Sequence, residues 1–535
     1  MMRTKSLILG GLLLSLEACG GGLAAGGSLA PDKVAAGHKT ASGGQVSKVA
    51  AASYDGALSA FLERDRKQDW AEASCVSVAK QFEDAASTQK SDTGRPFAEA
   101  LYNAGLAYQR CGKDEQARER FHAASQADAG FHRAKAQLVL YDYAKTNDLD
   151  GTINRLDQII HEAKFQNAEA LVSLAALQME RDGDQADSDG KDDLERAQKN
   201  LQRALAVDDT YMPAFNQLAV YYLEQAKKKA GAKARTRRGK RGMEVSGGRR
   251  KEVNEQQLDL AALVASQAQR KNPNYAPILN TAGLIQVELK NFNGAVKSFS
   301  RARQLDPKFF EAQMNYAAVN LSFRGYEEAE KAYREALRQR PKEYEACLGL
   351  ALAIRGQIGD DNFEKAVAEA QKYLDEAKKI DGSRGEAYYN EAILTHEFRA
   401  KRAGDQATPV LEKAAEQYRD FVNKAGDEPV FTQAVKRSKE RIQDIEDTIK
   451  FLRDGEQAKK DAEAAESAAK AQAEEAKKQA DAEKKAAEGA AKAGKDVPAA
   501  PGPDGKPADA GKAKAGDAKP PAPGAADKGP KPRKN

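Results

Sequence analysis

The sequence predicts an all-α protein in which helical hairpins stack into a solenoid, and three observations lead to this prediction. Prolines recur every 34 residues, at Pro273, Pro307 and Pro341. Small and large apolar residues keep the same step along the chain. Charged residues make up 31% of the 535 residues and aromatic residues only 7%, a composition that favours helix over large β-sheets. One such unit cannot bury its apolar face alone, so several copies must stack around a shared core.

The repeat has a defined internal pattern. Pairs at the 34-residue step are Gly283 and Ala317, Ala295 and Ala329, Phe299 and Tyr333, and Ala302 and Ala336. Residues 98–128 fit the same frame through Leu101, Ala104, Gly105, Tyr108, Gly112, Ala117, Phe121 and Ala124. Small residues let two helices cross closely and large ones fill the adjacent gaps, while proline ends the second helix. The pattern resembles the tetratricopeptide repeat (TPR) family, which implies a superhelix of helix pairs with a concave groove.

The amino terminus indicates export. Arg3 and Lys5 precede an apolar stretch that is shorter than the roughly 20 residues needed to cross a bilayer. Residues 1–18 are therefore interpreted as a signal peptide. Cys19 follows directly and resembles the cysteine of a bacterial lipobox, which implies that Cys19 carries lipid, although Glu17 departs from that motif. The alternative is an ordinary signal peptide that contains a cysteine.

The rest of the chain divides by composition. Residues 19–53 are rich in Gly, Ala and Ser and are expected to form a flexible linker. Residues 54–452 are expected to hold eight or nine helix pairs, closed by a single amphipathic capping helix from residue 429. Residues 453–496 contain Ala, Lys and Glu without a bulky apolar stripe, and we expect helix from propensity and Glu–Lys pairs alone. Residues 497–535 are rich in Pro, Ala, Gly and Lys, and we expect disorder.

Two charged insertions fall at turns inside repeats, where they should loop out without breaking the stack. Residues 181–193 are acidic, and residues 226–253 are basic. The basic insertion includes Lys227, Lys228, Lys229, Arg237, Arg238, Lys240 and Arg241. It favours contact with an acidic protein surface, anionic lipid or cell-wall polymer, or it is only a solvated loop. Nucleic acid is not expected, because an exported protein rarely meets it and the insertion lacks interleaved aromatic residues for stacking.

The concave groove is the predicted binding surface. In the family, second-turn side chains of each first helix face this groove, and here they include several amides, which bind peptide backbone with little sequence dependence. The predicted residues are Tyr102, Asn103, Gln109, Asn216, Gln217, Asn280, Asn315, Arg355, Tyr389 and Asn390, with Thr281, Ser322 and His396 in the same frame. The alternative is that these amides cap neighbouring helices or meet water.

The cysteines leave two interpretations open. Cys75 lies early in one second helix, and Cys111 lies at the end of the next first helix. Antiparallel packing brings those ends together, so a disulfide could form in an oxidising compartment. Equally, both could be small core residues. Cys347 is expected to pack between helices. No cysteine pair or Cys/His cluster has zinc-site spacing, so no metal is expected.

The sequence contains no HExxH, GxxxxGK[ST] or GxSxG motif, so we expect neither enzymatic activity nor a cofactor or small-molecule substrate. The expected role is that of a lipid-anchored scaffold facing the periplasm, with the outer membrane favoured because Gly20, not aspartate, follows Cys19. The whole arrangement is similar to the TPR lipoproteins of the myxobacterial gliding-motility machinery, which implies partners in such an envelope complex. The alternative is an accessory scaffold for peptidoglycan-processing or outer-membrane biogenesis enzymes.

Overall fold

The computed structural model describes residues 31–32, 39–40, 43–67, 69–236, 254–426 and 428–493. Helices account for all regular structure in these ranges, and the one β-type contact there is an isolated bridge between Lys39 and Gln45. The predicted all-α fold of stacked hairpins is confirmed.

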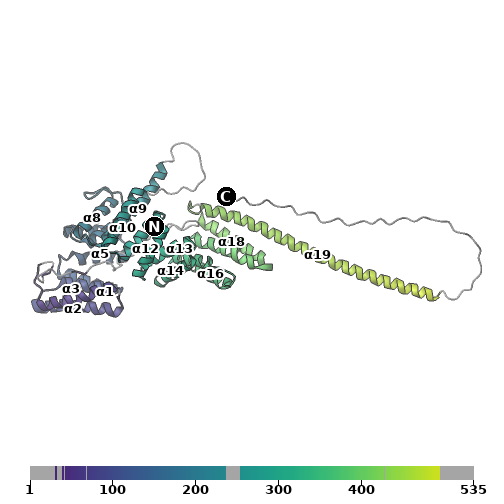
Figure 1. The fold of residues 1–535 in the computed structure, drawn as a ribbon, viewed down its shortest axis with the longest axis horizontal. Helices are drawn as coiled ribbons and strands as arrows, with labels where there is room; N and C mark the ends of the chain where they lie inside the picture. The colour runs from purple at the N-terminus through teal and green to yellow at the C-terminus, as the bar shows by residue number, and fades with distance from the viewer. Residues whose placement is uncertain are drawn as a thin grey trace, which may run out of the picture. The chain divides into compact units, whose positions relative to one another are not determined.

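Eighteen helices of the described chain pair into nine successive antiparallel hairpins, followed by a nineteenth helix (Figure 1). The hairpins are α1 (Lys48–Lys67) with α2 (Glu72–Thr93), α3 (Ala98–Gln109) with α4 (Asp114–Ala127), α5 (His132–Thr146) with α6 (Leu149–Glu162), α7 (Ala168–Arg181) with α8 (Asp193–Val207), α9 (Met212–Thr236) with α10 (Glu255–Lys271), α11 (Ala276–Glu288) with α12 (Phe292–Leu305), α13 (Phe310–Ser322) with α14 (Tyr326–Gln339), α15 (Tyr344–Arg355) with α16 (Phe363–Ile380), and α17 (Gly385–Ile393) with α18 (Ala407–Ala425). A π-helix (Leu394–Arg399) and two short 3₁₀ turns (Ala400–Arg402 and Gly404–Gln406) connect the last pair, and α19 spans Thr432–Ala493.

The repeat pattern explains how the two helices of a hairpin meet. A Cβ atom added at Gly105 in α3 would lie 2.6 Å from the Phe121 ring in α4, and one at Gly283 in α11 would collide with Phe299 in α12 in the same way. Both aromatic rings are fully buried. Glycine in the first helix is therefore required for the close crossing, because any larger residue would overlap the ring.

First helices line the inner side of the stack. Besides contacts between consecutive helices, α5 contacts α7, α7 contacts α9, and the series continues through α11, α13, α15 and α17. Helices that approach their second neighbours lie on the inner side of a curved array, because curvature brings successive units closest together there. The first helices thus form the face on which binding was predicted.

The structure differs from the expected boundaries at the amino-terminal end. The first helix begins at Lys48 instead of residue 54, and the preceding segment already packs on the helices. The Gln89 side chain accepts from the Ser47 backbone N–H at 2.8 Å and donates to the Gln45 carbonyl at 3.0 Å. Val46, between them, is buried. Residues 45–47 therefore belong to the folded body and not to a free linker. Cys19 lies outside the described residues.

The carboxy-terminal boundary falls where the composition changes. The chain divides into compact units after Leu452, although α19 continues to Ala493. From residue 453 to 489 every residue is exposed, and the pairs Glu466–Lys470 and Glu474–Lys478 lie along the helix at 2.7 and 3.0 Å. This part of α19 is supported by helix propensity and ion pairs, since it buries no apolar stripe. The expected disordered tail, residues 497–535, lies outside the described residues.

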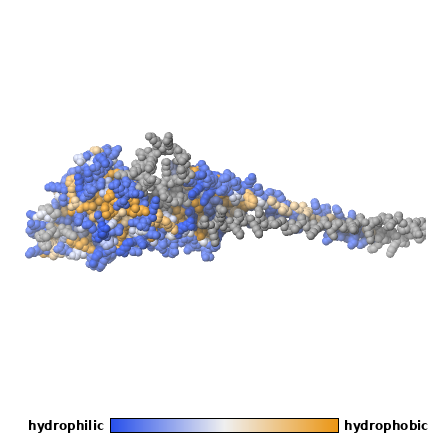
Figure 2. Space-filling model, turned by 45° about the horizontal axis from the view of Figure 1, so that its top comes forward, coloured by the Kyte–Doolittle hydropathy of each residue, from blue (hydrophilic) through white to orange (hydrophobic). Residues whose placement is uncertain are grey.

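Hydrophilic residues cover most of the visible face of the hairpin stack in Figure 2, with hydrophobic residues showing between them. Among the helices described, none is both long enough and apolar enough to span a membrane.

Candidate functional site

The most specific binding geometry on the first-helix face surrounds Asp32. The Asn103 side chain in α3 accepts from the Asp32 backbone N–H at 2.8 Å and donates to the Asp32 carbonyl at 3.1 Å. The Tyr54 hydroxyl in α1 donates to the same carbonyl at 2.6 Å and accepts from the Asn103 amide at 2.8 Å. Pro31, the preceding residue, is buried. One amide thus binds both backbone groups of a residue 71 positions away in sequence.

The Asp32 side chain is bound as well. Its carboxylate lies 3.2 Å from the Arg133 guanidinium in α5. Arg133 also donates from Nε to Glu169 in α7 at 3.1 Å and lies 4.7 Å from the centre of the Tyr102 ring. The Tyr102 hydroxyl donates to Glu169 at 3.0 Å. We call Tyr54, Tyr102, Asn103, Arg133 and Glu169 the aspartate seat; it draws on four successive first helices.

Burial and charge fix the protonation states of the aspartate seat. Burial raises the pKa of the Tyr54 and Tyr102 hydroxyls, and nearby carboxylates raise it further, so both remain protonated donors. Burial opposes the charge on Arg133, but Glu169 and the other partners outweigh it and raise the pKa of the guanidinium. The seat therefore offers neutral donors toward the backbone and a permanent cation toward a carboxylate.

The other predicted groove amides are used between helices. Asn315 in α13 donates to Asn280 in α11 at 2.9 Å, and Thr281 donates to Asn216 in α9 at 2.7 Å. Similar single contacts between helices join Gln109 to Tyr141 at 3.2 Å and Gln217 to Met179 at 3.4 Å. Ser322 instead donates within α13 to the Ala318 carbonyl at 2.9 Å. The amides that recur in the repeat frame thus link neighbouring helices, while the buried Oε1 of Gln109 accepts no hydrogen bond within the described residues.

A second arginine lies at the end of α15. Arg355 donates to the Asn390 side chain in α17 at 2.8 Å, and Asn390 in turn donates to the Glu386 carbonyl at 2.8 Å. Tyr389 is buried and stacks edge-on with Tyr418. Burial lowers the pKa of Arg355, and within the described chain Arg355 forms no ion pair with a carboxylate.

Seven of the predicted groove residues are buried, and their binding to a partner stays a prediction: Tyr102, Asn103, Gln109, Asn280, Asn315, Tyr389 and Asn390. Successive first helices approach closely enough for these side chains to bond to one another or, at Asn103, to Asp32. A buried amide without a partner would cost about 1–3 kcal/mol, so mutual pairing is the stable arrangement. Asn216, Gln217 and Arg355 are half-buried.

The sequence prediction missed Tyr54, Arg133 and Glu169, and for Glu169 a signal was present. Glutamate recurs at the second residue of first helices, at Glu99, Glu169, Glu311, Glu345 and Glu386. Arginines pair with this series: Arg133 with Glu169, Arg340 with Glu311, and Arg384 with Glu345 and Glu386. Each of these arginines covers the aromatic ring of Tyr102, Phe310 or Tyr344. No repeat signal could have identified Asp32, because it lies outside the repeats.

The cysteines are placed differently from one another. Cys75 in α2 and Cys111 after α3 form a disulfide, with Cα atoms 6.3 Å apart. Of the two interpretations left open, the structure has the bonded one. Cys347 is a free buried thiol, and burial raises the pKa of this thiol to about 11.

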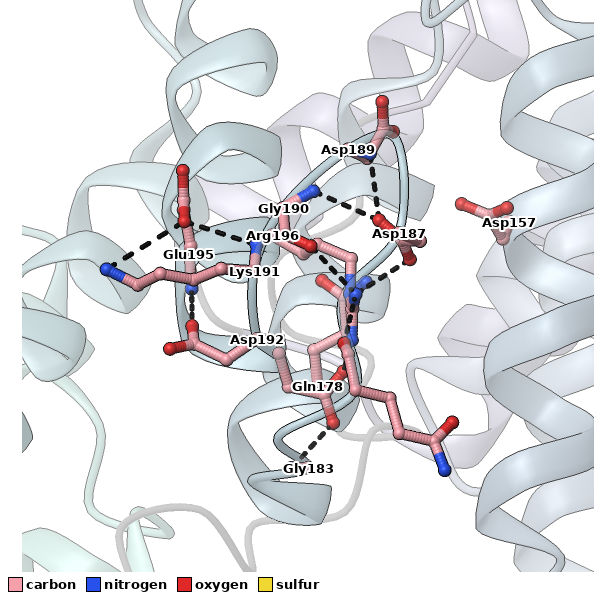
Figure 3. A network of polar contacts seen from close by, with 12 residues as sticks. Asp157, Gln178, Gly183, Asp187, Asp189, Gly190, Lys191, Asp192, Glu195 and Arg196 are labelled. Carbon is pink, nitrogen blue, oxygen red and sulfur yellow. Dashed lines mark hydrogen bonds and ion pairs between the residues drawn. The ribbon is translucent and has the colours of Figure 1, made fainter.

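The acidic insertion does not loop out freely but closes around one arginine (Figure 3). Arg196 of α8 donates to Asp187 at 2.7 Å, to Asp193 at 2.6 Å and to the Gln185 carbonyl at 2.9 Å. Arg181 at the end of α7 holds Asp193 from the other side at 2.7 Å. Hydrogen bonds to these guanidinium groups overcome burial and lower the pKa of Asp193 to about 2. The insertion is therefore part of the α7–α8 hairpin.

Asp157, His161 and Asp189 offer ligand atoms that lie within 4.8 Å of one another. Asp157 already lies 3.7 Å from His161, and Asp189 pairs with Arg203 at 3.2 Å. These side chains already contact one another or Arg203, and we assign no metal to the group.

The basic insertion begins as helix. Lys227, Lys228 and Lys229 lie within α9, because Lys and Ala favour helix there, and Lys227 lies 3.5 Å from Glu288. The expectation of a loop from residue 226 is wrong for these residues. Arg237, Arg238, Lys240 and Arg241 lie outside the described residues.

Comparisons with known proteins give structural likeness only. No protein-family model and no curated protein matches the chain. The TPR protein TTC0263 of Thermus thermophilus is 22% identical, covering 42% of this chain and 99% of its own, with a TM-score of 0.33. A TPR protein of Parabacteroides merdae is 16% identical over 57% of this chain and 98% of its own, and pilF of Pseudomonas aeruginosa is 18% identical over 48% and 95%, both with a TM-score of 0.33. The fold assignment therefore rests on the hairpins and on the 34-residue packing pattern themselves.

Proposed function

We propose that this chain is a protein-binding scaffold whose first-helix face binds extended polypeptide segments. The observation that supports this is the paired contact between the Asn103 side chain and the backbone of Asp32. Backbone N–H and C=O groups are present in every polypeptide, so an amide that binds both recognises an extended segment regardless of most of its side chains.

The surroundings of Asn103 favour binding over catalysis. Tyr54 holds the amide from one side, and the neighbouring ring of Tyr102 is fully buried, so the amide is oriented before any ligand arrives. A side chain fixed in this way loses little conformational entropy on binding. The polar groups of the seat are paired donors and acceptors, with a permanent cation beside them.

The test is crosslinking in intact cells followed by identification of the captured proteins, with wild-type chain, Asn103→Ala and a matched control. Gln158→Ala removes an exposed amide that bonds only within its own helix, so it should leave capture unchanged. Partners that bind the first-helix face should be captured by wild type and by Gln158→Ala but not by Asn103→Ala. Unchanged capture by a folded Asn103→Ala chain would exclude this face as the binding surface.

We propose that the scaffold works in the bacterial cell envelope, held by lipid on Cys19. The short apolar segment before Cys19 supports export, and the Cys75–Cys111 disulfide fits an oxidising compartment. Metabolic labelling with a fatty-acid analogue tests the anchor. The label and membrane association should both be lost in Cys19→Ala, and membrane retention of an unlabelled chain would contradict the anchor.

Within the envelope, we propose membership of a gliding-motility assembly, on the resemblance in architecture to repeat lipoproteins of that machinery. Deleting the gene should stop spreading of cells on a surface without altering growth in liquid. Capture of peptidoglycan-processing or outer-membrane biogenesis enzymes, with spreading intact, would instead assign the accessory role.

A further inference from the structure

The occupant of the aspartate seat belongs to the chain itself. Pro31 and Asp32 precede the first helix, yet they reach α1, α3 and α5 at once. We propose that the seat recognises an extended segment carrying an aspartate, and that Pro31–Asp32 fills it as an internal competitor that a partner must displace. This inference rests on the proposed function and adds the ligand chemistry and its control.

The seat distinguishes aspartate from other residues through geometry. The backbone of the bound residue is fixed by Asn103 and Tyr54, so its side chain can extend only a set distance. At that distance Arg133 meets the Asp32 carboxylate at 3.2 Å. A segment without a carboxylate at this position would lose the charge-assisted contact with Arg133.

The contact is partly sheltered from solvent. The Asp32 and Arg133 side chains are 20% and 24% exposed, and the Glu169 side chain is 9% exposed. Exposed ion pairs are worth little, whereas a sheltered pair that also forms hydrogen bonds discriminates between ligands. The seat therefore has the features of a recognition site and not of a chance surface contact.

The internal segment is held close to its seat. Gln89 binds the backbone of Gln45 and Ser47, which fixes residues 45–47 directly before α1. Because Asp32 and the seat belong to one chain, the local concentration of Asp32 at the seat is high, on the order of millimolar by the usual estimate for intramolecular binding. A partner segment of equal intrinsic affinity must compete with that concentration. Its apparent affinity is therefore its intrinsic affinity multiplied by the fraction of seats that Pro31–Asp32 leaves unoccupied.

The experiment measures binding of a labelled peptide with the sequence of residues 28–36, Ser-Leu-Ala-Pro-Asp-Lys-Val-Ala-Ala, by fluorescence anisotropy. The full chain is compared with Asp32→Ala, which removes the carboxylate that Arg133 binds and so weakens the internal competitor without changing a helix residue. Asp209→Ala is the matched control, because it removes an exposed carboxylate paired with Lys271 elsewhere. If Pro31–Asp32 fills the seat nine-tenths of the time in wild type, Asp32→Ala should bind the peptide more tightly than wild type and Asp209→Ala, by up to about tenfold when loss of the carboxylate releases the internal segment fully.

Two further arms complete the test. A peptide with alanine in place of its aspartate should bind Asp32→Ala weakly, and the double variant Asp32→Ala with Asn103→Ala should lose binding while keeping its helical circular dichroism. Equal affinity of wild type and Asp32→Ala for the peptide, whether tight or absent, overturns the inference. That result leaves the proposed function standing if Asn103→Ala still loses partners in cells, so the two failures are distinguishable.

Discussion

Arg133 and Arg355 both project from first helices, but their electrostatic surroundings are opposite. Arg133 meets the carboxylates of Glu169 and Asp32 and covers the ring of Tyr102. Arg355 meets the neutral amide of Asn390, and a second cation, Arg441, lies near enough to lower its pKa further. On the same first-helix face, carboxylates thus compensate the charge of Arg133 near one end of the hairpin stack, whereas Arg355 near the other end is a desolvated cation. Pairing, and not residue type, decides whether a buried arginine stabilises the fold.

The two ends also differ in covalent restraint, and removing it should have the largest effect. The Cys75–Cys111 disulfide spans 36 residues and ties α2 to the end of α3. Its loss through Cys75→Ala with Cys111→Ala should destabilise the first units by about 3–4 kcal/mol, by the loop-entropy estimate. In a solenoid each unit contacts only its neighbours, so the loss should stay local. Hydrogen exchange with mass spectrometry should show weaker protection in α1–α4 and unchanged protection in α15–α18.

Cys347→Ala is the control for this first comparison, because it removes a free buried thiol from the other end. It should loosen α15 and its neighbours slightly and leave α1–α4 unaltered. Uniform loss of protection along the whole stack in the double variant would show that the units do not unfold locally.

The same substitution at the two arginines gives the next largest effect. Arg133→Gln leaves Glu169 sheltered without its cation, so we expect a loss of about 2 kcal/mol, below the full cost of breaking a buried pair because Arg133 is partly exposed. Urea unfolding measures it, and Glu115→Gln, which removes an exposed partner of Lys145, should change stability by no more than about 0.5 kcal/mol. Equal stability of Arg133→Gln and wild type would contradict the compensated site.

Arg355→Gln should act in the opposite direction and more weakly. Glutamine keeps a donor for the Asn390 oxygen but removes the desolvated charge, so we expect stabilisation of up to about 1 kcal/mol. Thermal unfolding of wild type and Arg355→Gln at the same protein concentration measures whether the substitution stabilises or destabilises the protein. A clear loss of stability would contradict the description of Arg355 as a destabilising desolvated cation.

The sequence predicted the hairpins because their packing is local, whereas the partners of the groove residues depend on distant contacts. Gly105 and Phe121 lie in one hairpin, so their pairing follows from the repeat. Asn103 and Asn280 belong to the same predicted amide set, yet Asn280 bonds to Asn315 and Asn103 bonds to Asp32. The donor and the acceptor of a side-chain amide can be satisfied equally well by a side chain on a neighbouring helix or by the backbone of an extended segment. The difference is set by a segment 71 residues away, which the repeat pattern does not contain.

The smallest expected effect is a pH dependence of stability that arises from His396, near the end of the hairpin stack that contains Arg355. His396, in the π-helix beside α18, lies against the Tyr418 ring, and its charged neighbours are Glu397, Lys401, Arg441 and Asp444. Burial lowers the pKa of His396, and Arg441 and Lys401 lower it further, while the carboxylates oppose them.

Because the folded pKa of His396 lies below the unfolded value of about 6.5, the unfolded chain binds the proton more readily. This contribution to stability is complete above pH of about 6.5 and is lost as pH falls toward the folded pKa. Urea midpoints at about pH 7.5 and 5.5 should therefore differ less in His396→Gln than in wild type. His122→Gln, at an exposed position in α4, should leave the wild-type difference intact. If His396→Gln retains the full wild-type pH dependence, protonation of His396 does not contribute to that dependence.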